Sequence, residues 1–416
     1  MDAIRIYGAK CLDGQTTIQG SKNASLPILA ATLLINGTCE IENCPDISDV
    51  YHMQRLLESL GCKVVREGPL VRINTEGLSE CDMPADSVGV MRSSIMLLGA
   101  LLARTGSVSM EYPGGCVIGA RPIDLHLQSL HEMGVVIEQK EEGFSAQAAR
   151  LRGTVFHLPF VSVGVTENLL LAAALAEGVT VIEPAAREPE IQALCDFLNK
   201  AGARIEGKGS ERLIVHGVKK LSPVRFRVPS DRIVAGTYMC ACMCTGGEIF
   251  LKDAPVQDME SVITCARQMG AAVDYAADGI QVTGRAYESM ADLLRTGCYP
   301  EFPTDMQSPF MVVMAVSGRS GRIEETVFEN RFRIVPELIK MGADISVRGN
   351  TAYINGNRKL HGAIVQAEEL RGGAALVVAA LAADGTSIIT NRHYIDRGYE
   401  DIVFRLRELG AEIELA

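Results

Sequence analysis

The chain has 416 residues, a net charge of −11 and no tryptophan, and aromatic residues make up only 5% of it. This length predicts two or three domains. Because the sequence has no block of Lys and Arg and few aromatic platforms, it excludes a protein whose main partner is nucleic acid. A small anionic ligand remains compatible with the composition, since a few placed Lys and Arg side chains can bind it.

Twelve cysteines are spread along the chain, without a CxxC pair and without histidine at zinc-site spacing. So many unpaired thiols favour a reducing compartment. The N-terminal residues are too polar for a signal peptide, and the longest apolar runs, such as residues 374–383, are far shorter than the roughly 20 residues that span a bilayer. We therefore expect a cytoplasmic protein without a metal, a cofactor or a membrane contact. The cysteines at positions 240, 242 and 244 are expected to pack a helix.

The first predicted element is a strand over residues 3–7. An apolar helix over residues 24–35 follows, and then a Gly-led strand, GTCEI. An amphipathic helix over residues 47–60 ends at Gly61, as a left-handed C′ glycine would end it, and a strand completes the unit. The apolar helix is expected to be buried, and the amphipathic helix should show a polar face to solvent.

The same order of elements recurs six times at intervals of about 70 residues. The second apolar helix is predicted over residues 93–103, and the glycines that end the amphipathic helices are Gly61, Gly134, Gly202, Gly270, Gly342 and Gly410. The stretch at residues 226–231 divides the chain after three units. We expect two halves of three repeats, residues 22–229 and residues 1–21 with 230–416, joined by a double crossing of the chain. The N-terminal strand is expected to pair with the last repeat.

Polar residues stand at the expected starts of the apolar helices. Capping explains Ser162 and Asp231 about as well as a ligand site does. A cation opposes the helix dipole at this end, so Lys22, Arg92 and Arg371 predict a nearby anion from the protein or from a ligand. Converging helix starts would attract such an anion. The full set is Lys22, Asn23, Arg92, Ser162, Asp231, Asp305, Glu369 and Arg371.

The segment YPGGCVIGARPIDLH, residues 112–126, is the most specific feature of the sequence. Three glycines flank Cys116, and Arg121 follows five residues later. Such a Gly-rich stretch is typical of a loop. A nearby cation favours the thiolate, so we expect Cys116 to give and take protons.

Three later segments also carry unusual polar residues. PEFPTDMQSPF places Asp305 after a proline-containing turn, and TVFENRF places Val327 and Arg331 in a loop of the fifth repeat. HYIDRGYED places Arg397 beside a glycine in the sixth repeat. Taken alone, a surface ion pair explains Asp396 and Arg397 about as often as a site does.

The segments GSKNASLPIL, PGGCVIGARPIDLH, AAREPEI, FPTDMQ, ETVFENRF and HYIDRGYED resemble the signatures of the UDP-N-acetylglucosamine 1-carboxyvinyltransferase family. The resemblance runs from the first residues to the last. It implies two inverse α/β domains, each with three βαβαββ repeats in pseudo-threefold arrangement, and a substrate cleft between them. It also implies transfer of the enolpyruvyl group of phosphoenolpyruvate to the 3-hydroxyl of UDP-N-acetylglucosamine with release of phosphate. This is the first committed step of peptidoglycan synthesis.

The resemblance assigns the chemistry to a few residues. Lys22 would contact the phosphate of phosphoenolpyruvate, and Arg397 would close on the same substrate. Cys116 would protonate its methylene carbon and could form a covalent adduct with it, which makes this thiol the expected target of fosfomycin. Asp305 would accept the proton of the sugar hydroxyl. Asn23 would contact the sugar.

The resemblance also implies a larger set of substrate contacts. Arg92 would contact the nucleotide sugar, Arg121 phosphate, and Val327 the sugar nucleotide. The uridine nucleotide would be lined by Arg121, Pro122, Ile123, Asp124, Leu125, Ser162, Val163 and Gly164. Asp231, Arg331, Glu369 and Arg371 complete the predicted substrate-binding set.

Two positions depart from the family pattern. Glu369 stands where the family usually has Asp, and the longer side chain shifts its carboxylate by about 1 Å. Phe160 stands where some members carry a basic residue near the uridine site, so we expect altered nucleotide contacts without loss of binding. Two alternatives stay open: a transferase like 5-enolpyruvylshikimate-3-phosphate synthase, which lacks the PGGC loop, and a non-catalytic paralogue that binds a UDP-sugar.

Overall fold

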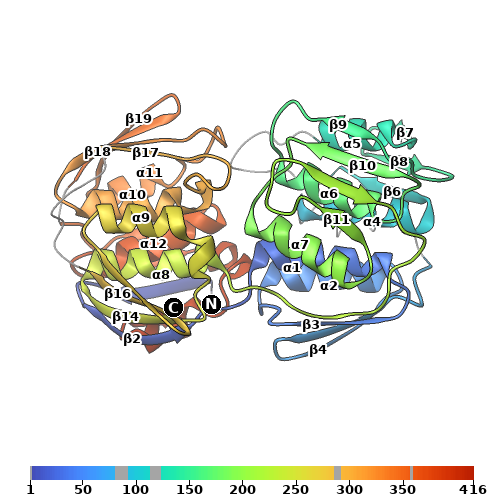
Figure 1. The fold of residues 1–416 in the computed structure, drawn as a ribbon. Coiled ribbons are helices and arrows are strands. Elements are labelled where there is room, and N and C mark those ends of the chain that lie inside the picture. Colours follow the sequence, from blue (N-terminus) through green and yellow to red (C-terminus); the bar gives the residue numbers. More distant parts are fainter. Residues whose placement is uncertain (1, 80–91, 113–122, 285–291, 357–358) are drawn as a thin grey trace. The chain divides into compact units, whose positions relative to one another are not determined.

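A computed structural model describes residues 2–79, 92–112, 123–284, 292–356 and 359–416. The chain divides into two compact units. The middle unit consists of the described residues between Gly20 and Pro229. The terminal unit combines the N-terminal segment up to Gln19 with residues from Ser230 to Ala416 (Figure 1).

Each unit contains three apolar helices that lie inside it. Their residues are buried almost throughout, as expected for helices that are apolar on every side. In the middle unit they are α1 (Lys22–Ala31), α4 (Met96–Thr105) and α6 (Val163–Ala173). In the terminal unit they are α8 (Arg232–Thr245), α10 (Gln307–Val316) and α12 (Leu370–Ala382). All three cysteines of this run lie on α8: Cys240 and Cys242 are buried in the core, and the half-buried Cys244 packs against it, which confirms the structural interpretation of these thiols.

Among the described residues, six further helices are amphipathic and keep one face exposed. They are α2 (Ser48–Ser59), α5 (Asp124–Glu132), α7 (Pro189–Lys200), α9 (Glu260–Gln268), α11 (Val335–Lys340) and α13 (Ile402–Glu408). The six glycines that follow them have φ between 83° and 106°. A residue with a Cβ atom rarely adopts this backbone conformation. The predicted helix ends are therefore confirmed.

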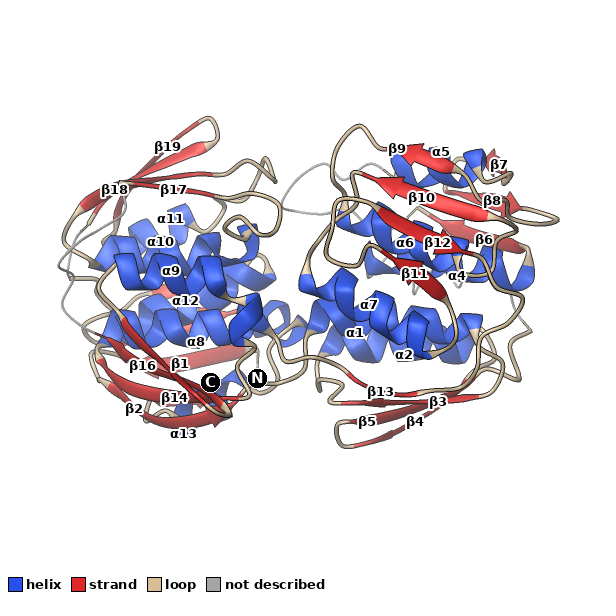
Figure 2. Cartoon of the chain, viewed as in Figure 1, coloured by secondary structure: helices blue, strands red, loops and turns tan. Residues whose placement is uncertain are grey.

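The sheets enclose the buried helices of each unit (Figure 2). In the middle unit the strand orders are β13 (Arg225–Arg227), β3 (Thr38–Glu42), β5 (Leu70–Asn74), β4 (Lys63–Glu67); β9 (Val155–His157), β10 (Val179–Glu183), β12 (Leu213–His216), β11 (Arg204–Glu206); and β6 (Ser107–Glu111), β8 (Gly143–Gln147), β7 (Val136–Gln139).

The terminal unit has three four-stranded sheets. Their orders are β2 (Leu12–Thr17), β14 (Gly247–Lys252), β16 (Gly279–Gly284), β15 (Ala272–Ala276); β17 (Leu293–Arg295), β18 (Ser320–Glu324), β20 (Thr351–Asn355), β19 (Asp344–Arg348); and β21 (Ile364–Gln366), β22 (Thr386–Thr390), β1 (Ala3–Tyr7), β23 (Glu412–Leu415). In the repeat β17, α10, β18, α11, β19, β20 the first two strands are parallel and the rest pair antiparallel. This arrangement confirms the βαβαββ repeat.

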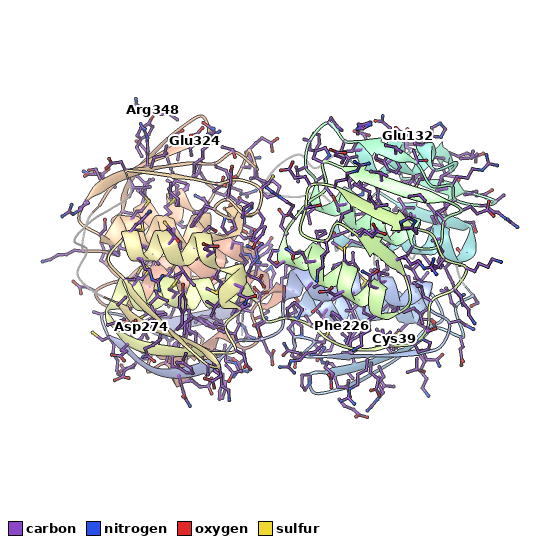
Figure 3. The ribbon with its side chains drawn as sticks, viewed as in Figure 1. Cys39, Glu132, Phe226, Asp274, Glu324 and Arg348 are labelled. Carbon is purple, nitrogen blue, oxygen red and sulfur yellow. The ribbon has the colours of Figure 1, made fainter. Side chains whose placement is uncertain are left out.

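Strands distant in sequence close both units. The N-terminal strand β1 lies between β22 and β23 and pairs antiparallel with each, which confirms the predicted pairing with the last repeat. Strand β2 runs parallel to β14. In the middle unit, β13 runs parallel to β3, and its Phe226 meets the ring of Phe197 edge to face at 5.6 Å. Figure 3 labels Phe226, and it also labels the exposed charged side chains of Glu132, Asp274 and Arg348.

The starts of two apolar helices differ from the sequence prediction. Helix α1 begins at Lys22 and not at residue 24, because Ser21 accepts a hydrogen bond from the backbone N–H of Ala24 at 3.2 Å and so caps the helix earlier. The 3₁₀ turn η1 (Thr32–Leu34) follows it. The 3₁₀ turn η2 (Arg92–Ile95) precedes α4, so this helix begins later than predicted.

Candidate functional site

The predicted cation of α1 has a protein anion beside it. Lys22 Nζ lies 2.7 Å from Asp49 Oδ2, and both residues are buried. Asp49 stands in the first turn of α2, which packs on α1. The sequence predicted an anion near Lys22 but did not identify Asp49, because the two residues come together only when α2 folds back on α1. Asn23, the next residue, is half-buried.

The terminal unit brings a carboxylate and two arginines together. Asp305 lies in η4 (Thr304–Met306), at the start of α10. Its Oδ1 accepts a hydrogen bond from Arg331 Nη2 at 2.6 Å. Its Oδ2 accepts from Arg371 Nη2 at 2.9 Å and from Arg371 Nε at 3.1 Å. These charge-assisted bonds stabilise the ionised carboxylate.

Both arginines are almost completely buried, each with 3% of its surface exposed. Burial by itself lowers the pKa of Arg371, but Asp305, Tyr399 and Asp231 together raise this pKa above its ordinary value. Arg331 Nε and Arg371 Nη1 have no hydrogen-bond partner among the described residues. A buried donor without an acceptor costs stability, and both of these nitrogen atoms are buried.

Three predicted site residues also cap the buried helices. Asp231 Oδ1 accepts from the backbone N–H groups of Ile233 and Val234 at 2.9 and 3.1 Å. Ser162 Oγ accepts from Val165 N at 3.4 Å. The carboxylate of Glu369 accepts from Arg371 N at 2.7 Å and from Gly372 N. Capping alone therefore explains why these three polar residues stand at the starts of apolar helices.

Glu369 joins the charged cluster of the terminal unit as well. Its Oε2 lies 4.0 Å from Arg331 Nη1. The structure thus gathers four predicted residues of the terminal unit around one another: Asp305, Arg331, Glu369 and Arg371. Asp231 acts on Arg371 through its charge.

Two further predicted residues of the terminal unit lie on loops. Arg397 is the last residue of η5 (Arg392–Arg397) and is half-buried. The segment that follows Arg397 is held by Gln19, whose side chain donates to Gly398 O at 3.1 Å and accepts from Glu400 N at 2.7 Å. Sequence reasoning missed Gln19, which shows no motif of its own. Val327 is 37% exposed, and its N–H donates to Glu325 Oε1 at 2.8 Å.

The segments predicted to hold the nucleotide meet in the middle unit. Ile123 and Asp124 stand at the start of α5, with Leu125 next, while Ser162, Val163 and Gly164 stand at the start of α6. A Cβ atom added at Gly164 would lie 3.2 Å from Cε1 and 3.4 Å from Nε2 of His126. Gly164 therefore leaves the room that the His126 ring needs, and the two helix starts pack closely.

Part of the prediction lies outside the described residues. Cys116, Arg121 and Pro122 belong to that part, and of Arg92 the structure gives only the backbone, at the start of η2.

The ten described cysteines are all free. Burial raises the pKa of Cys62 to about 11 and that of Cys195 to about 12. Such thiols are poor proton donors at neutral pH.

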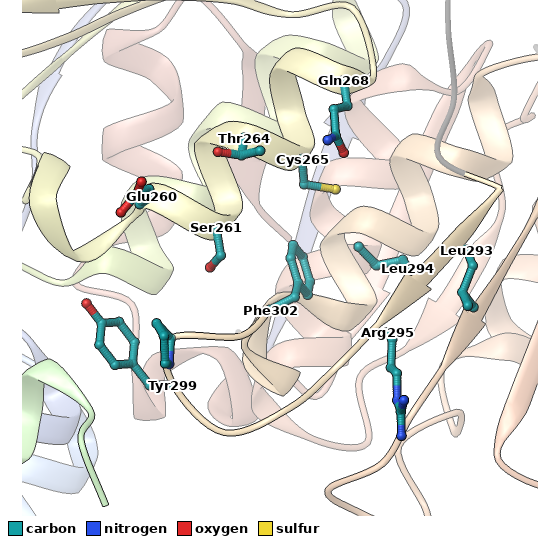
Figure 4. Close-up of a pocket in the computed structure, with 11 residues that line it drawn as sticks. Glu260, Ser261, Thr264, Cys265, Gln268, Leu293, Leu294, Arg295, Tyr299 and Phe302 are labelled. Atoms are coloured by element: carbon teal, nitrogen blue, oxygen red, sulfur yellow. The ribbon is translucent and has the colours of Figure 1, made fainter. Parts of the chain in front are cut away.

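A surface pocket of about 490 Å³ lies elsewhere in the terminal unit. Figure 4 shows the residues that line it: Ser261, Thr264 and Cys265 on α9, Leu293 and Leu294 on β17, and Tyr299 and Phe302 on the segment after β17. None of the predicted site residues lines it.

Among the described residues, no group of three or more His, Cys, Asp or Glu side chains could hold a metal ion. The described helices are too short or too polar for any of them to cross a membrane.

Comparisons with known proteins agree with this architecture. A model of the EPSP synthase (3-phosphoshikimate 1-carboxyvinyltransferase) family matches residues 6–406. The enolpyruvyl transferase NikO from Streptomyces tendae superposes with a TM-score of 0.89 at 25% identity, over 99% of this chain and 98% of that one. EPSP synthase from Acinetobacter baumannii superposes with a TM-score of 0.76 at 19% identity over the whole of both chains, a likeness that concerns the fold alone.

Curated relatives match more closely in sequence. UDP-N-acetylglucosamine 1-carboxyvinyltransferase 2 of Caldanaerobacter subterraneus subsp. tengcongensis is 43% identical over 99% of each chain. The UDP-N-acetylglucosamine 1-carboxyvinyltransferase of Desulfatibacillum aliphaticivorans is 44% identical over the same shares, and that of Shewanella denitrificans is also 44% identical. The chain therefore belongs to the UDP-N-acetylglucosamine 1-carboxyvinyltransferase family, among the enolpyruvyl transferases.

Proposed function

We propose that this chain transfers the enolpyruvyl group of phosphoenolpyruvate to the 3-hydroxyl of UDP-N-acetylglucosamine and releases phosphate, as the first committed step of peptidoglycan synthesis. The observation that carries the proposal is identity of 43% over 99% of both chains to a relative named for this reaction. The charged cluster around Asp305 supports it, because the reaction needs a carboxylate and cations close together.

The proposed mechanism adds and then eliminates. Cys116 gives its proton to C3 of phosphoenolpyruvate, which leaves C2 electron-poor. The 3-hydroxyl oxygen of the sugar bonds to C2 while Asp305 accepts the hydroxyl proton. The Cys116 thiolate then takes a proton back from the C3 methyl group, the bond from C2 to the phosphate oxygen breaks, and the enol ether forms. The leaving phosphate keeps the electron pair of that bond and takes the proton that Asp305 accepted. Lys22 and Arg397 bind the anionic groups of phosphoenolpyruvate in this proposal.

The arginines around Asp305 suit this role. A proton acceptor must be ionised before the reaction begins, and Arg331 and Arg371 stabilise the ionised carboxylate. The same two side chains fix its direction, because each oxygen has its own guanidinium partner. A positioned acid or base of this kind typically accelerates a reaction by about 10²–10⁴-fold.

The ten cysteines that the structure describes are all free and support a cytoplasmic protein, since thiols in such number persist in a reducing compartment. We add this location to the proposal. If cell fractionation found the protein outside the cytoplasmic membrane, the proposed location would be wrong.

A phosphate-release assay tests the reaction. We expect release only when phosphoenolpyruvate and UDP-N-acetylglucosamine are both present. Release with shikimate 3-phosphate in place of the UDP-sugar would favour the EPSP synthase reaction, which the matching family model makes the second candidate. Binding of the UDP-sugar without any phosphate release would instead identify a non-catalytic binding protein.

A further inference from the structure

A buried asparagine joins three segments of the middle unit. Asn168 lies on α6, and only 1% of its surface is exposed. Its Nδ2 donates to Ile95 O at 2.8 Å, and its Oδ1 accepts from Gly99 N at 2.8 Å. A third bond, of 2.9 Å, joins Nδ2 to His126 Nδ1 on α5. Both amide hydrogens and one lone pair of the oxygen are thus used.

The bonds of Asn168 to the backbone hold the start of α4. Ile95 is the last residue of η2, and Gly99 lies four residues later, the spacing of one α-helical hydrogen bond. The amide of Asn168 therefore contacts both ends of the first turn of α4. A Cβ atom at Gly99 would lie 2.4 Å from Asn168 O and 2.9 Å from its Oδ1, so only glycine permits this approach.

The same bonds fix the protonation state of His126. The amide cannot be turned around, because its oxygen would then face Ile95 O and its NH₂ would face the N–H of Gly99. Nδ2 is consequently the donor to His126 Nδ1, and Nδ1 must accept. A neutral ring with its proton on Nε2 satisfies this arrangement. The opposite edge of the ring packs against Gly164.

The three segments that meet at this pair are those assigned to the nucleotide. Asn168 contacts the turn that starts at Arg92, and His126 directly follows Asp124 and Leu125 on α5. The ring of His126 also contacts Gly164, next to the Ser162 cap. We propose that Asn168, with His126 as its partner, is a positioning residue that sets the geometry of the UDP-sugar-binding segments. This proposal rests on the proposed function.

The prediction concerns affinity for one substrate. Asn168→Ala removes the amide that bonds Ile95 O, Gly99 N and His126 Nδ1, so the three segments lose their common anchor. We expect the dissociation constant and the KM for UDP-N-acetylglucosamine to rise about tenfold or more, the effect of roughly 1.4 kcal/mol. The KM for phosphoenolpyruvate and the kcat should change less than about threefold. A general loss of packing would not separate the two substrates in this way.

Asn199→Ala is the matched control. Asn199 also bridges backbone groups in the middle unit, because its side chain donates to Ile205 O at 3.0 Å and accepts from Ile205 N at 2.8 Å. It anchors β11, which is not one of the three segments. We expect this variant to lower the melting temperature without changing the KM for the UDP-sugar.

The measurements are calorimetric titration with UDP-N-acetylglucosamine and steady-state kinetics on both substrates. If Asn168→Ala folds and binds the UDP-sugar as the wild type does, the positioning role is overturned while the proposed function stands. If it does not fold, His126→Ala decides, because this change leaves the bonds of Asn168 to α4 in place; unchanged affinity there overturns the proposal. A wild-type protein that binds the sugar without turnover refutes the function alone, and one that binds no UDP-sugar refutes both.

Discussion

Asp305 is paired with two buried arginines, Arg331 and Arg371. Replacing Asp305 tests whether it is the proton acceptor of the reaction. In Asp305→Asn the amide NH₂ would face one of two buried guanidinium groups, and the side chain could no longer take a proton. We expect kcat to fall by about 10² or more. Asp196→Asn is the control, because Asp196 is paired with Lys208 at 2.7 Å on the surface and should leave kcat within about twofold. Comparable losses in the two variants would remove Asp305 from the mechanism.

Glu369 keeps the capping role that a shorter Asp would fill. Its two carboxylate oxygens accept from the backbone N–H groups of Arg371 and Gly372, the second and third residues of α12, and Asp is a preferred residue at this position. Glu369→Asp should therefore retain both stability and activity, as measured by thermal melting and phosphate release. Glu369→Ala, the comparison, should lose about 1 kcal/mol of stability with the cap. A steep loss of activity in Glu369→Asp alone would mean that the neighbouring charges have adapted to Glu.

Cys116 should be the thiol that the epoxide fosfomycin alkylates, because the resemblance assigns it the proton-donating role. The exposed Cys11 and Cys298 serve as internal controls in the same chain. Peptide mass spectrometry should find the adduct at Cys116 and not at the other two. Cys116→Asp should keep turnover and lose sensitivity, since a carboxylic acid can also give a proton. Equal labelling of Cys11 would contradict a selectively reactive Cys116.

At the residue scale the sequence predicts polar residues at helix starts but cannot say what they contact. Ser162, Asp231 and Glu369 cap helices, and capping residues look the same in a sequence whether or not a ligand is near. The partner of Lys22 was missed, because Asp49 reads as an ordinary first-turn acid of an amphipathic helix. The pairing of Asp305 with Arg331 and Arg371 crosses 26 and 66 residues of chain, beyond the range of local patterns.

Helix α6 carries a buried acid that makes the stability of the protein depend on pH. Glu167 is 2% exposed, and its Oε2 has no hydrogen-bond partner among the described residues. Burial, followed by the charges of Glu190 and Glu188, raises its pKa well above the ordinary value of 4.5. The folded state therefore holds a proton that the unfolded chain releases above pH 4.5, so this contribution to stability falls as pH rises toward the folded pKa.

Glu167→Gln should remove this dependence, because an amide has no proton to lose. We expect the variant and the wild type to have similar unfolding free energies below pH 4.5. Above that pH the variant should become the more stable of the two, with a difference that grows until the folded pKa is reached. Urea unfolding at several pH values measures it. Two curves that stay parallel across the range would show that Glu167 does not titrate in this way.

At the element scale the repeat made most of the fold predictable. The left-handed glycines fixed six helix ends, since few other residues adopt that conformation. The starts of two helices differ from the prediction. Helix α1 begins earlier in the chain because Ser21 caps it, and α4 begins later because η2 precedes it. The hydrogen bonds of Asn168 could not be predicted, because an asparagine inside an apolar helix gives no sign of which neighbouring backbone it will meet.

At the scale of the whole molecule, the N-terminal strands are part of a unit that otherwise begins after residue 229. Strand β1 is an inner strand between β22 and β23, and β2 is paired with β14. Removing residues 1–19 would expose the edges of β22 and β23 to solvent and leave their backbone groups unpaired. The apolar residues Ile4 and Ile6, which are fully buried, would also be lost from the core.

Fragments of the chain test this organisation. Residues 20–229 have their own core and their own closing strand, β13, so we expect this fragment to fold alone, with dispersed amide signals in NMR and a cooperative melt. Residues 230–416 alone should lack both properties and aggregate. Fusing residues 1–19 to the end of that fragment through a flexible linker should restore folding, since β1 pairs with β23, the last strand of the chain. A fragment of residues 230–416 that folds without help would show that β1 and β2 only decorate a core that is already complete.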